Sequence, residues 1–250
     1  MKKKVLAIFA HPDDAELMCA GTLSLLKKQG WEIHIATMTP GDKGTENLSR
    51  DEISIIRRAE ARKSAELIGG TYHCLELEDG YILYDRTSIN TATALIRKVQ
   101  PDIVFTASPQ DYMVDHEMTS KIVQTACFVC GIKNMEAEEK PFERVPYLYY
   151  SDAMEGKDKF GNPVAPAMIV DITDEMSMKE KMLASHESQR GWLLKHHKID
   201  EYILAMKRFA EIRGEQINTS YAEGFRQHLG HGYPQNNILK EILGNLVVIR

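Results

Sequence analysis

The sequence predicts an α/β protein, a Rossmann-like three-layer α/β/α sandwich built on a mostly parallel sheet. Short apolar segments of strand length alternate with longer segments whose apolar residues recur at helical spacing. This alternation implies parallel strand pairs joined by right-handed crossovers. The chain has 250 residues, enough for one large domain with a sizeable core. We therefore expect residues 1–250 to form a single domain, with a C-terminal tail at 219–250 that completes the functional site or an oligomer interface.

The predicted elements alternate regularly in the first half of the chain. Residues 4–10 are a continuous apolar run, as expected for a strand buried on both faces. Residues 14–28 have the apolar spacing of a helix, which Gly30 ends. The other elements predicted here are strands at 31–38, 72–77 and 103–107 and helices at 51–68, 91–99 and 116–129.

The second half is predicted to contain strands at 146–151 and 168–172 and helices at 176–189 and 201–213. Residues 195–198, which include two histidines, are expected to form a solvated helix face. Residues 221–235 are rich in glycine, histidine and aromatic residues and show no period. In an open parallel sheet, sites form at the carboxyl ends of the strands. This rule indicates the loops that follow Ala10, Met38, Leu77 and Ala107.

Composition excludes several classes of protein. Lysine and arginine total 31 against 36 acidic residues, a net charge of −5 that argues against a nucleic-acid partner. No apolar stretch approaches the ~18 residues of a membrane span. The apolar run at 5–10 is too short for a signal peptide, so we expect a cytoplasmic protein. The four cysteines form no disulfide framework, and the C-x-x-C pair at 127–130 lacks the second pair of a zinc ribbon.

Side chains of metal-ligand type follow the first predicted strand, where His11, Asp13 and Asp14 stand close together. A dinucleotide site would need G-x-G-x-x-G at this turn. Two adjacent aspartates at a buried strand end repel each other unless a positive charge is near, and a divalent metal would supply it. The alternative is that Asp13 or Asp14 caps the following helix.

A second group of such side chains, Asp115 and His116, follows the fourth predicted strand. A parallel sheet could bring it beside the first. His11, one aspartate and His116 would then form the two-imidazole, one-carboxylate set of a catalytic zinc site, with a fourth position free for water. The aspartate that does not bind metal could act as general base. The same ligand set also suits Fe²⁺.

The run Ala10-His11-Pro12-Asp13-Asp14-Ala15-Glu16 resembles the signature of the PIG-L/LmbE-type zinc deacetylases, which remove the acetyl group from N-acetylglucosaminyl compounds. Further segments resemble other elements of that family: Arg57-Arg58-Ala59-Glu60, Leu67-Ile68-Gly69-Gly70, Pro101-Asp102-Ile103-Val104, Asp115-His116, His186-Glu187-Ser188-Gln189 and Glu223-Gly224-Phe225. The resemblance covers most of the chain. It implies a metal-dependent amide hydrolase that acts on a small N-acetylated amino sugar, with zinc-bound water as the nucleophile.

The resemblance also implies individual roles. His11, Asp14 and His116 would bind Zn²⁺, Asp13 would be the general base, and Arg57 would contact the substrate. Without this resemblance, the sequence would indicate that Arg57 lies on a solvated helix face or forms an ion pair with the glutamate three residues on. Relatives commonly assemble as trimers or hexamers, so we expect a homo-oligomer.

One departure from the family pattern matters. The family loop usually reads D-x-H-x-D-H, and Met113 stands here in place of its first histidine. A methionine cannot donate a proton or a hydrogen bond. We therefore expect His228 or His231, from this chain or a neighbouring one, to supply the missing imidazole at the substrate. Two alternatives stay open: an amidase for a different amide, of the thiol-conjugate type, and a zinc- or sugar-binding protein with little turnover.

Overall fold

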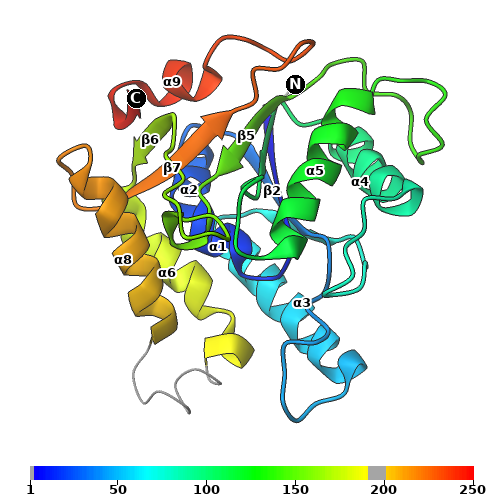
Figure 1. Ribbon diagram of the computed structural model, residues 1–250, viewed down its shortest axis with the longest axis horizontal. Coiled ribbons are helices and arrows are strands. Elements are labelled where there is room, and N and C mark those ends of the chain that lie inside the picture. Colours follow the sequence, from blue (N-terminus) through cyan, green and yellow to red (C-terminus); the bar gives the residue numbers. More distant parts are fainter. Residues whose placement is uncertain (1–2, 191–200) are drawn as a thin grey trace.

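The computed structural model describes residues 3–190 and 201–250. One eight-stranded sheet, in the order β3-β2-β1-β4-β5-β7-β6-β8, carries helices on both faces (Figure 1). Its strands are β1 (Lys4–Phe9), β2 (Glu32–Thr37), β3 (Thr71–Cys74), β4 (Ile103–Thr106), β5 (Tyr147–Ser151), β6 (Met168–Asp171), β7 (Ala222–Gln227) and β8 (Val247–Ile249). The helices are α1 (Asp14–Met18), α2 (Ala20–Lys28), α3 (Arg50–Leu67), α4 (Arg86–Val99), α5 (Val114–Val129), α6 (Met176–Ala184), α8 (Glu201–Glu215) and α9 (Ile238–Leu243). The predicted sandwich is confirmed. The solvated helix face predicted at 195–198 lies outside the described residues.

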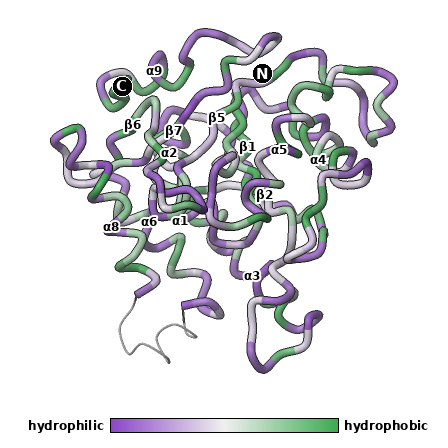
Figure 2. Tube along the Cα trace, viewed as in Figure 1, coloured by the Kyte–Doolittle hydropathy of each residue, from purple (hydrophilic) through white to green (hydrophobic). Residues whose placement is uncertain are grey.

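Strand β1 divides the core into its two layers, because successive side chains of a strand point to opposite faces of the sheet. Val5, Ala7 and Phe9 pack with α1, α2, α6 and α8 on one face. Leu6 and Ile8 pack with α4 and α5 on the other. All five side chains are at most 1% exposed, as expected of a strand covered on both sides. Figure 2 shows apolar and polar residues alternating around the covering helices.

The sheet is parallel from β3 to β5 and antiparallel beyond it. Strand β1 pairs in parallel with β2 and with β4, so the carboxyl ends of these strands open at one edge. Strand β7 runs antiparallel between β5 and β6, and β8 pairs with β6. The tail therefore contributes strands to the sheet that its composition did not reveal.

Strand β7 is not an apolar run, because it carries a buried charged residue, and it was therefore not predicted from the sequence. Glu223 is the second residue of this strand and is 3% exposed. Its carboxylate accepts hydrogen bonds from the amides of Gly21 and Thr22 and from Nζ of Lys179. Full hydrogen bonding of this kind is the condition under which a charge can be buried. Glu223 thereby ties β7 to α2 and α6.

Several helix boundaries differ from those expected. The predicted helix at 14–28 is broken at Cys19, where φ is −146°, into the short α1 and the longer α2. The helix expected from residue 91 begins at Arg86, because the Asp85 side chain accepts a hydrogen bond from the Ser88 amide and caps it. The helix predicted at 176–189 is interrupted after Ala184. The break at Cys19 leaves α1 as a compact turn at the end of β1.

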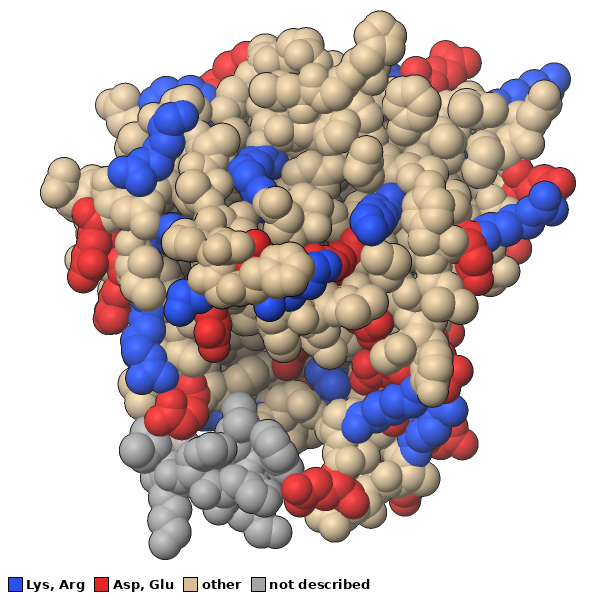
Figure 3. All heavy atoms as spheres, in the orientation of Figure 1, with Lys and Arg blue, Asp and Glu red and all other residues tan. Residues whose placement is uncertain are grey.

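The four cysteines are free thiols, and Cys19, Cys127 and Cys130 are buried as packing residues. Among the described residues no helix is both long and apolar enough to cross a membrane. Figure 3 shows acidic and basic side chains interspersed over the visible face.

Candidate metal centre

Three side chains meet where the carboxyl ends of β1 and β4 lie side by side. His11 follows β1, Asp14 begins α1, and His116 lies in the first turn of α5. One Asp14 oxygen is 3.5 Å from Nδ1 of His11, and the other is 3.5 Å from Nε2 of His116. One donor atom from each residue lies within 4.8 Å of the others, and all three residues are buried. The parallel pairing of β1 and β4 thus brings together the three residues that the sequence indicated.

Three other carboxylates contact the ring nitrogens of His11 and His116 that do not face Asp14, and they orient the two imidazoles. Nε2 of His11 lies 3.1 Å from Asp79 and 3.4 Å from Asp115. Nδ1 of His116 lies 3.0 Å from Asp111. Histidines that bind metals usually donate their other ring N–H to a carboxylate in this way. The remaining nitrogens, Nδ1 of His11 and Nε2 of His116, face Asp14 and could hold a divalent cation with it.

The charge balance supports the same conclusion. Burial lowers the pKa of His116, but Asp14 and Asp111 outweigh it and raise that pKa to about 10. Burial also lowers the pKa of His11, and its hydrogen bonds with carboxylates outweigh burial, so that pKa lies well above the usual value. Burial raises the pKa of Asp14, yet the two imidazoles hold it well below its usual range. The site is thus built to stabilise concentrated positive charge, which a divalent cation would supply.

Asp13 has its carboxylate in a different environment. Its backbone is left-handed, with φ 108° and ψ −24°, a conformation that costs a residue other than glycine about 1–3 kcal/mol and is concentrated at functional sites. Its side chain makes no capping bond to α1, so the capping alternative does not hold for Asp13. Instead it accepts a hydrogen bond of 2.5 Å from the Tyr202 hydroxyl. Burial raises the pKa of Asp13, and Arg57 opposes that rise.

Arg57 is buried beneath the turn that carries Asp13. It donates to the carbonyl of Pro12 at 2.7 Å and to that of Gly41 at 3.3 Å, and it lies 3.6 Å from the Asp13 carboxylate. It is 4% exposed, so it does not form part of a solvated helix face. Glu60 accepts hydrogen bonds from Ser188 instead of pairing with Arg57. These contacts fix the geometry of the Pro12–Asp13 turn.

The two tail histidines lie elsewhere in this chain. His228 follows β7, and its amide bonds to the carbonyl of Leu148 near the amino end of β5, whereas the metal group lies at the carboxyl end of the sheet. Its ring contacts Tyr150 and Tyr233. His231 is exposed. The contacts of His228 therefore place it, within one chain, away from the metal group, and a role for His228 or His231 at the site stays a prediction.

Four residues of the site were not singled out from the sequence. Asp79 follows the third predicted strand, so the strand-end rule indicated its loop but not the residue. Tyr112 stacks edge-on against His116, with ring centroids 5.8 Å apart. Tyr202 comes from α8, far along the chain, and no local pattern marks it. Arg226 lies on β7 and donates to Ser108 and Gln110 in the loop after β4, which only the pairing of β7 with β5 could reveal.

The fold and this site define a class, the Rossmann-like α/β proteins with a candidate His-Asp-His metal centre at the carboxyl edge of the sheet. Residues 6–127 match the PIG-L family, described as GlcNAc-PI de-N-acetylase. The diacetylchitobiose deacetylase of Thermococcus kodakarensis is 30% identical over 200 residues, which cover 75% of this chain and 70% of that protein. The chain belongs to the PIG-L/LmbE-like deacetylase family.

A solved structure and a more distant relative extend the comparison. The N,N'-diacetylchitobiose deacetylase of Pyrococcus horikoshii, solved with an inhibitor, superposes with a TM-score of 0.78 and 29% identity, covering 94% of this chain and 88% of that one. A 4-oxalmesaconate hydratase of Pseudomonas putida is 24% identical over 147 residues, covering 56% of this chain and 57% of the relative.

Proposed function

We propose that this protein is a metal-dependent N-deacetylase of N-acetylglucosaminyl compounds. The observation that carries the proposal is the convergence of His11, Asp14 and His116 beside Asp13. His11, Asp14 and His116 would hold Zn²⁺, with Fe²⁺ the other metal that this ligand set suits. The deacetylases among the relatives support the same reaction class.

The residues divide the reaction between them. A divalent cation at this site would polarise the acyl carbonyl and acidify water. Asp13 accepts the proton of the attacking water and returns it to the amine that leaves. Its raised pKa favours the first step, because a carboxylate with a higher pKa is a stronger base toward the attacking water. Tyr202 and Arg57 hold the Asp13 carboxylate in place. The products are acetate and a free amino sugar.

Three further roles stay predictions. Arg57 would contact the substrate, as the resemblance implies, although the contacts described above support a positioning role first. His228 and His231 would reach a substrate only from a neighbouring chain, since within one chain His228 lies toward the other end of β5. This requirement fits the expected homo-oligomer, a trimer or hexamer. The group attached to the sugar is a small glycoside, a malate-bearing thiol precursor or a chitooligosaccharide.

Acetate release tests the proposal directly. Purified protein is stripped with a chelator, reloaded with Zn²⁺ and assayed on N-acetylglucosamine derivatives, with Asp13→Asn and the exposed Asp174→Asn as a matched pair. We expect release that requires metal, falls at least 100-fold in Asp13→Asn and is unchanged in Asp174→Asn. Equal release by all three proteins would overturn Asp13 as the base.

The alternative of low turnover rests on Met113, which stands at the N-cap position of α5, where the family has a histidine. Met113→His restores a hydrogen-bond donor beside the site. If the protein is a deacetylase limited by that loss, Met113→His should raise kcat at least tenfold, since a general acid typically contributes 10²–10⁴. A protein specialised for another amide, or for hydration as in the Pseudomonas relative, would gain nothing on N-acetyl sugars.

A further inference from the structure

Two carboxylates that contact the ring of His11 depend on one short segment of the chain. Asp79 lies 3.1 Å and Asp115 lies 3.4 Å from Nε2 of His11. The amide of Gly80 donates a hydrogen bond of 2.7 Å to the Asp115 carboxylate. The segment Asp79–Gly80 lies between β3 and α4, where neither a strand nor a helix fixes the backbone. Its position therefore depends on contacts with other parts of the chain.

Asp42, in the loop between β2 and α3, makes such a contact. Its Oδ1 accepts a hydrogen bond of 3.0 Å from the amide of Asp79. Its Oδ2 accepts a hydrogen bond of 2.6 Å from Nε of Arg50, the first residue of α3. Asp42 is 6% exposed, and its carboxylate can be buried because it is both paired and hydrogen-bonded. Asp42 thus connects α3 to the backbone of Asp79.

Lys43 binds Asp79 at two further points. Its Nζ donates a hydrogen bond of 2.6 Å to the carbonyl of Asp79, and its amide donates one of 3.4 Å to Oδ2 of the Asp79 carboxylate. The other carboxylate oxygen, Oδ1, is the one that contacts His11. Asp42 and Lys43 together bind the amide, the carbonyl and one carboxylate oxygen of Asp79. The loop between β2 and α3 therefore fixes how Asp79 presents Oδ1 to a candidate metal ligand.

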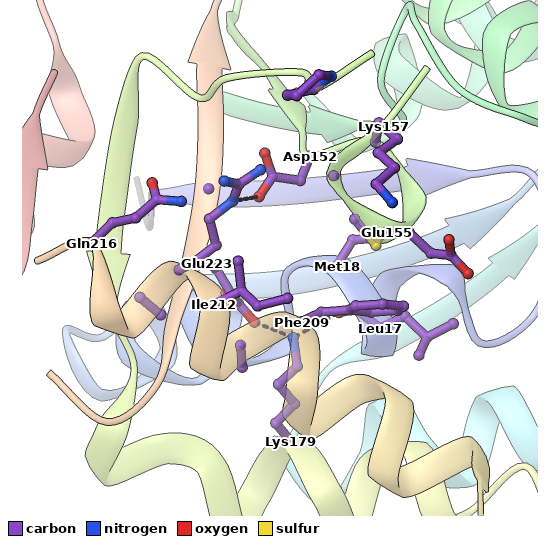
Figure 4. A pocket seen from close by; sticks show the side chains of 17 residues that line it. Leu17, Met18, Asp152, Glu155, Lys157, Lys179, Phe209, Ile212, Gln216 and Glu223 are labelled. Atoms are coloured by element: carbon purple, nitrogen blue, oxygen red, sulfur yellow. Dashed lines mark hydrogen bonds and ion pairs between the residues drawn. The ribbon is translucent and has the colours of Figure 1, made fainter. Parts of the chain in front are cut away.

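Two other acidic side chains near α1 are engaged elsewhere. Figure 4 shows a cavity of about 320 Å³ beside α1, in which Lys179 pairs with Glu223 and Arg213 pairs with Asp152, each at 2.6 Å. In the part of the chain that the structure describes, neither of these carboxylates pairs with His11. The charges around this cavity therefore do not orient the His11 ring, whereas the loop between β2 and α3 does.

We propose that Asp42 is a positioning residue of the metal centre. Its carboxylate holds the Asp79–Gly80 segment in place, and this segment in turn sets the orientation of the His11 ring. Arg50 assists by neutralising the Asp42 charge, because carboxylates that lie close together without a cation repel each other. This inference rests on the metal centre of the proposed function and not on its substrate.

Zinc affinity, measured without substrate, tests this role. Chelator-stripped protein competes with a chromophoric chelator for Zn²⁺. We expect Asp42→Ala to weaken Zn²⁺ binding roughly fivefold, which is less than the 10–100-fold typical of a group that contacts a metal ligand directly, because Asp42 acts through Asp79. Asp42→Asn keeps one oxygen that can accept from the Asp79 amide, so it should lose less affinity than Asp42→Ala.

Arg50→Gln is a second variant that does not alter a buried side chain, since the Arg50 side chain is 58% exposed. It should weaken Zn²⁺ binding roughly threefold, because Asp42 loses the cation that neutralises it. Asp51→Asn changes the charge of the next residue, which is exposed, and is the matched control. It should bind Zn²⁺ as the parent does. Urea unfolding of the stripped proteins shows whether each variant is folded.

A double substitution separates positioning from a general loss of stability. If Asp42 acts through Asp79, Asp42→Ala should cost at most about twofold in Zn²⁺ affinity when it is introduced into Asp79→Ala, because substitutions of residues that act through one another are not additive. The carboxylate that Asp42 positions is already absent from that protein. A structural effect alone would weaken binding by the same factor in both proteins.

The outcomes separate this inference from the proposed function. Parental Zn²⁺ affinity in both Asp42→Ala and Arg50→Gln would overturn the positioning role and leave the proposed deacetylase standing. Equal losses in Arg50→Gln and Asp51→Asn, or additive losses in the double variant, would overturn it as well. The expected losses in a protein that releases no acetate would support the positioning role and overturn the proposed function. A parent protein that binds no Zn²⁺ would overturn both.

Discussion

Asp115 lies 3.4 Å from Nε2 of His11 and accepts a hydrogen bond of 2.7 Å from the amide of Gly80. The family loop usually has a histidine two residues before this aspartate, and Met113 stands there in this chain. In this structure Asp115 contacts His11 and thereby fixes the ring of a candidate metal ligand. The loss of the family histidine therefore does not leave this buried carboxylate without a partner.

Asp115→Asn should weaken metal binding. The amide keeps the Gly80 contact but no longer polarises the His11 ring, and removal of such a partner typically costs 10–100-fold in metal affinity. We expect roughly tenfold, since Asp79 still contacts the same nitrogen. Competition of Zn²⁺ against a chromophoric chelator measures the change. Unaltered affinity, with the exposed Asp174→Asn as reference, would contradict this role.

Gly41→Ala should destabilise the protein more than Gly161→Ala. Both glycines have positive φ, +69° and +81°, so both substitutions strain the backbone. Only at Gly41 would the new Cβ meet another group, Nη1 of Arg57, which lies 2.3 Å from the Cβ position; at Gly161 no atom lies within 4 Å. We expect an additional cost of about 1 kcal/mol or more in urea unfolding. Equal costs would show that Arg57 is free to move away.

Tyr202→Phe should shift the acid limb of the kcat/KM profile to higher pH. The Tyr202 hydroxyl donates to the Asp13 carboxylate and thereby lowers the pKa of Asp13, so its removal lets that pKa rise further. Below the new pKa the base is protonated and inactive. Tyr84→Phe, at a tyrosine that is 53% exposed and bonds to Thr125, serves as the control. A profile that does not move would separate Tyr202 from the function of Asp13.

The pair His34–His73 should make stability depend on pH. Their nitrogens are 3.0 Å apart, and burial lowers the pKa of His73 to about 4. Between pH 4 and about 6.5 the unfolded chain therefore binds more protons at His73 than the folded chain does, so stability rises with pH in this window and is lost on acidification. Urea midpoints from pH 7 to 5 should fall less steeply in His73→Gln than in the parent or in His231→Gln. Parallel slopes would refute this contribution.

The fold was predictable from the sequence because its central strands are apolar on both faces, and residues 4–10 show this directly. The ligands His11, Asp14 and His116 were predictable because each follows or begins an element at a strand end. Asp79, Tyr202 and Arg226 were not, because they reach the site through tertiary packing of a loop, a helix and an antiparallel strand. Strand β7 was missed for a related reason: Glu223 interrupts its apolar character, and the partners that make its burial tolerable come from α2 and α6.

The most direct test of the account is a metal titration of activity. Chelator-stripped protein receives increasing Zn²⁺, and acetate release from an N-acetylglucosamine derivative is followed against bound metal, with His116→Ala alongside. If a metal ion bound by His11, Asp14 and His116 is required, activity should rise from zero, saturate at one ion per chain and be absent from His116→Ala. Full activity in the stripped protein, or saturation unaffected by His116→Ala, would contradict it.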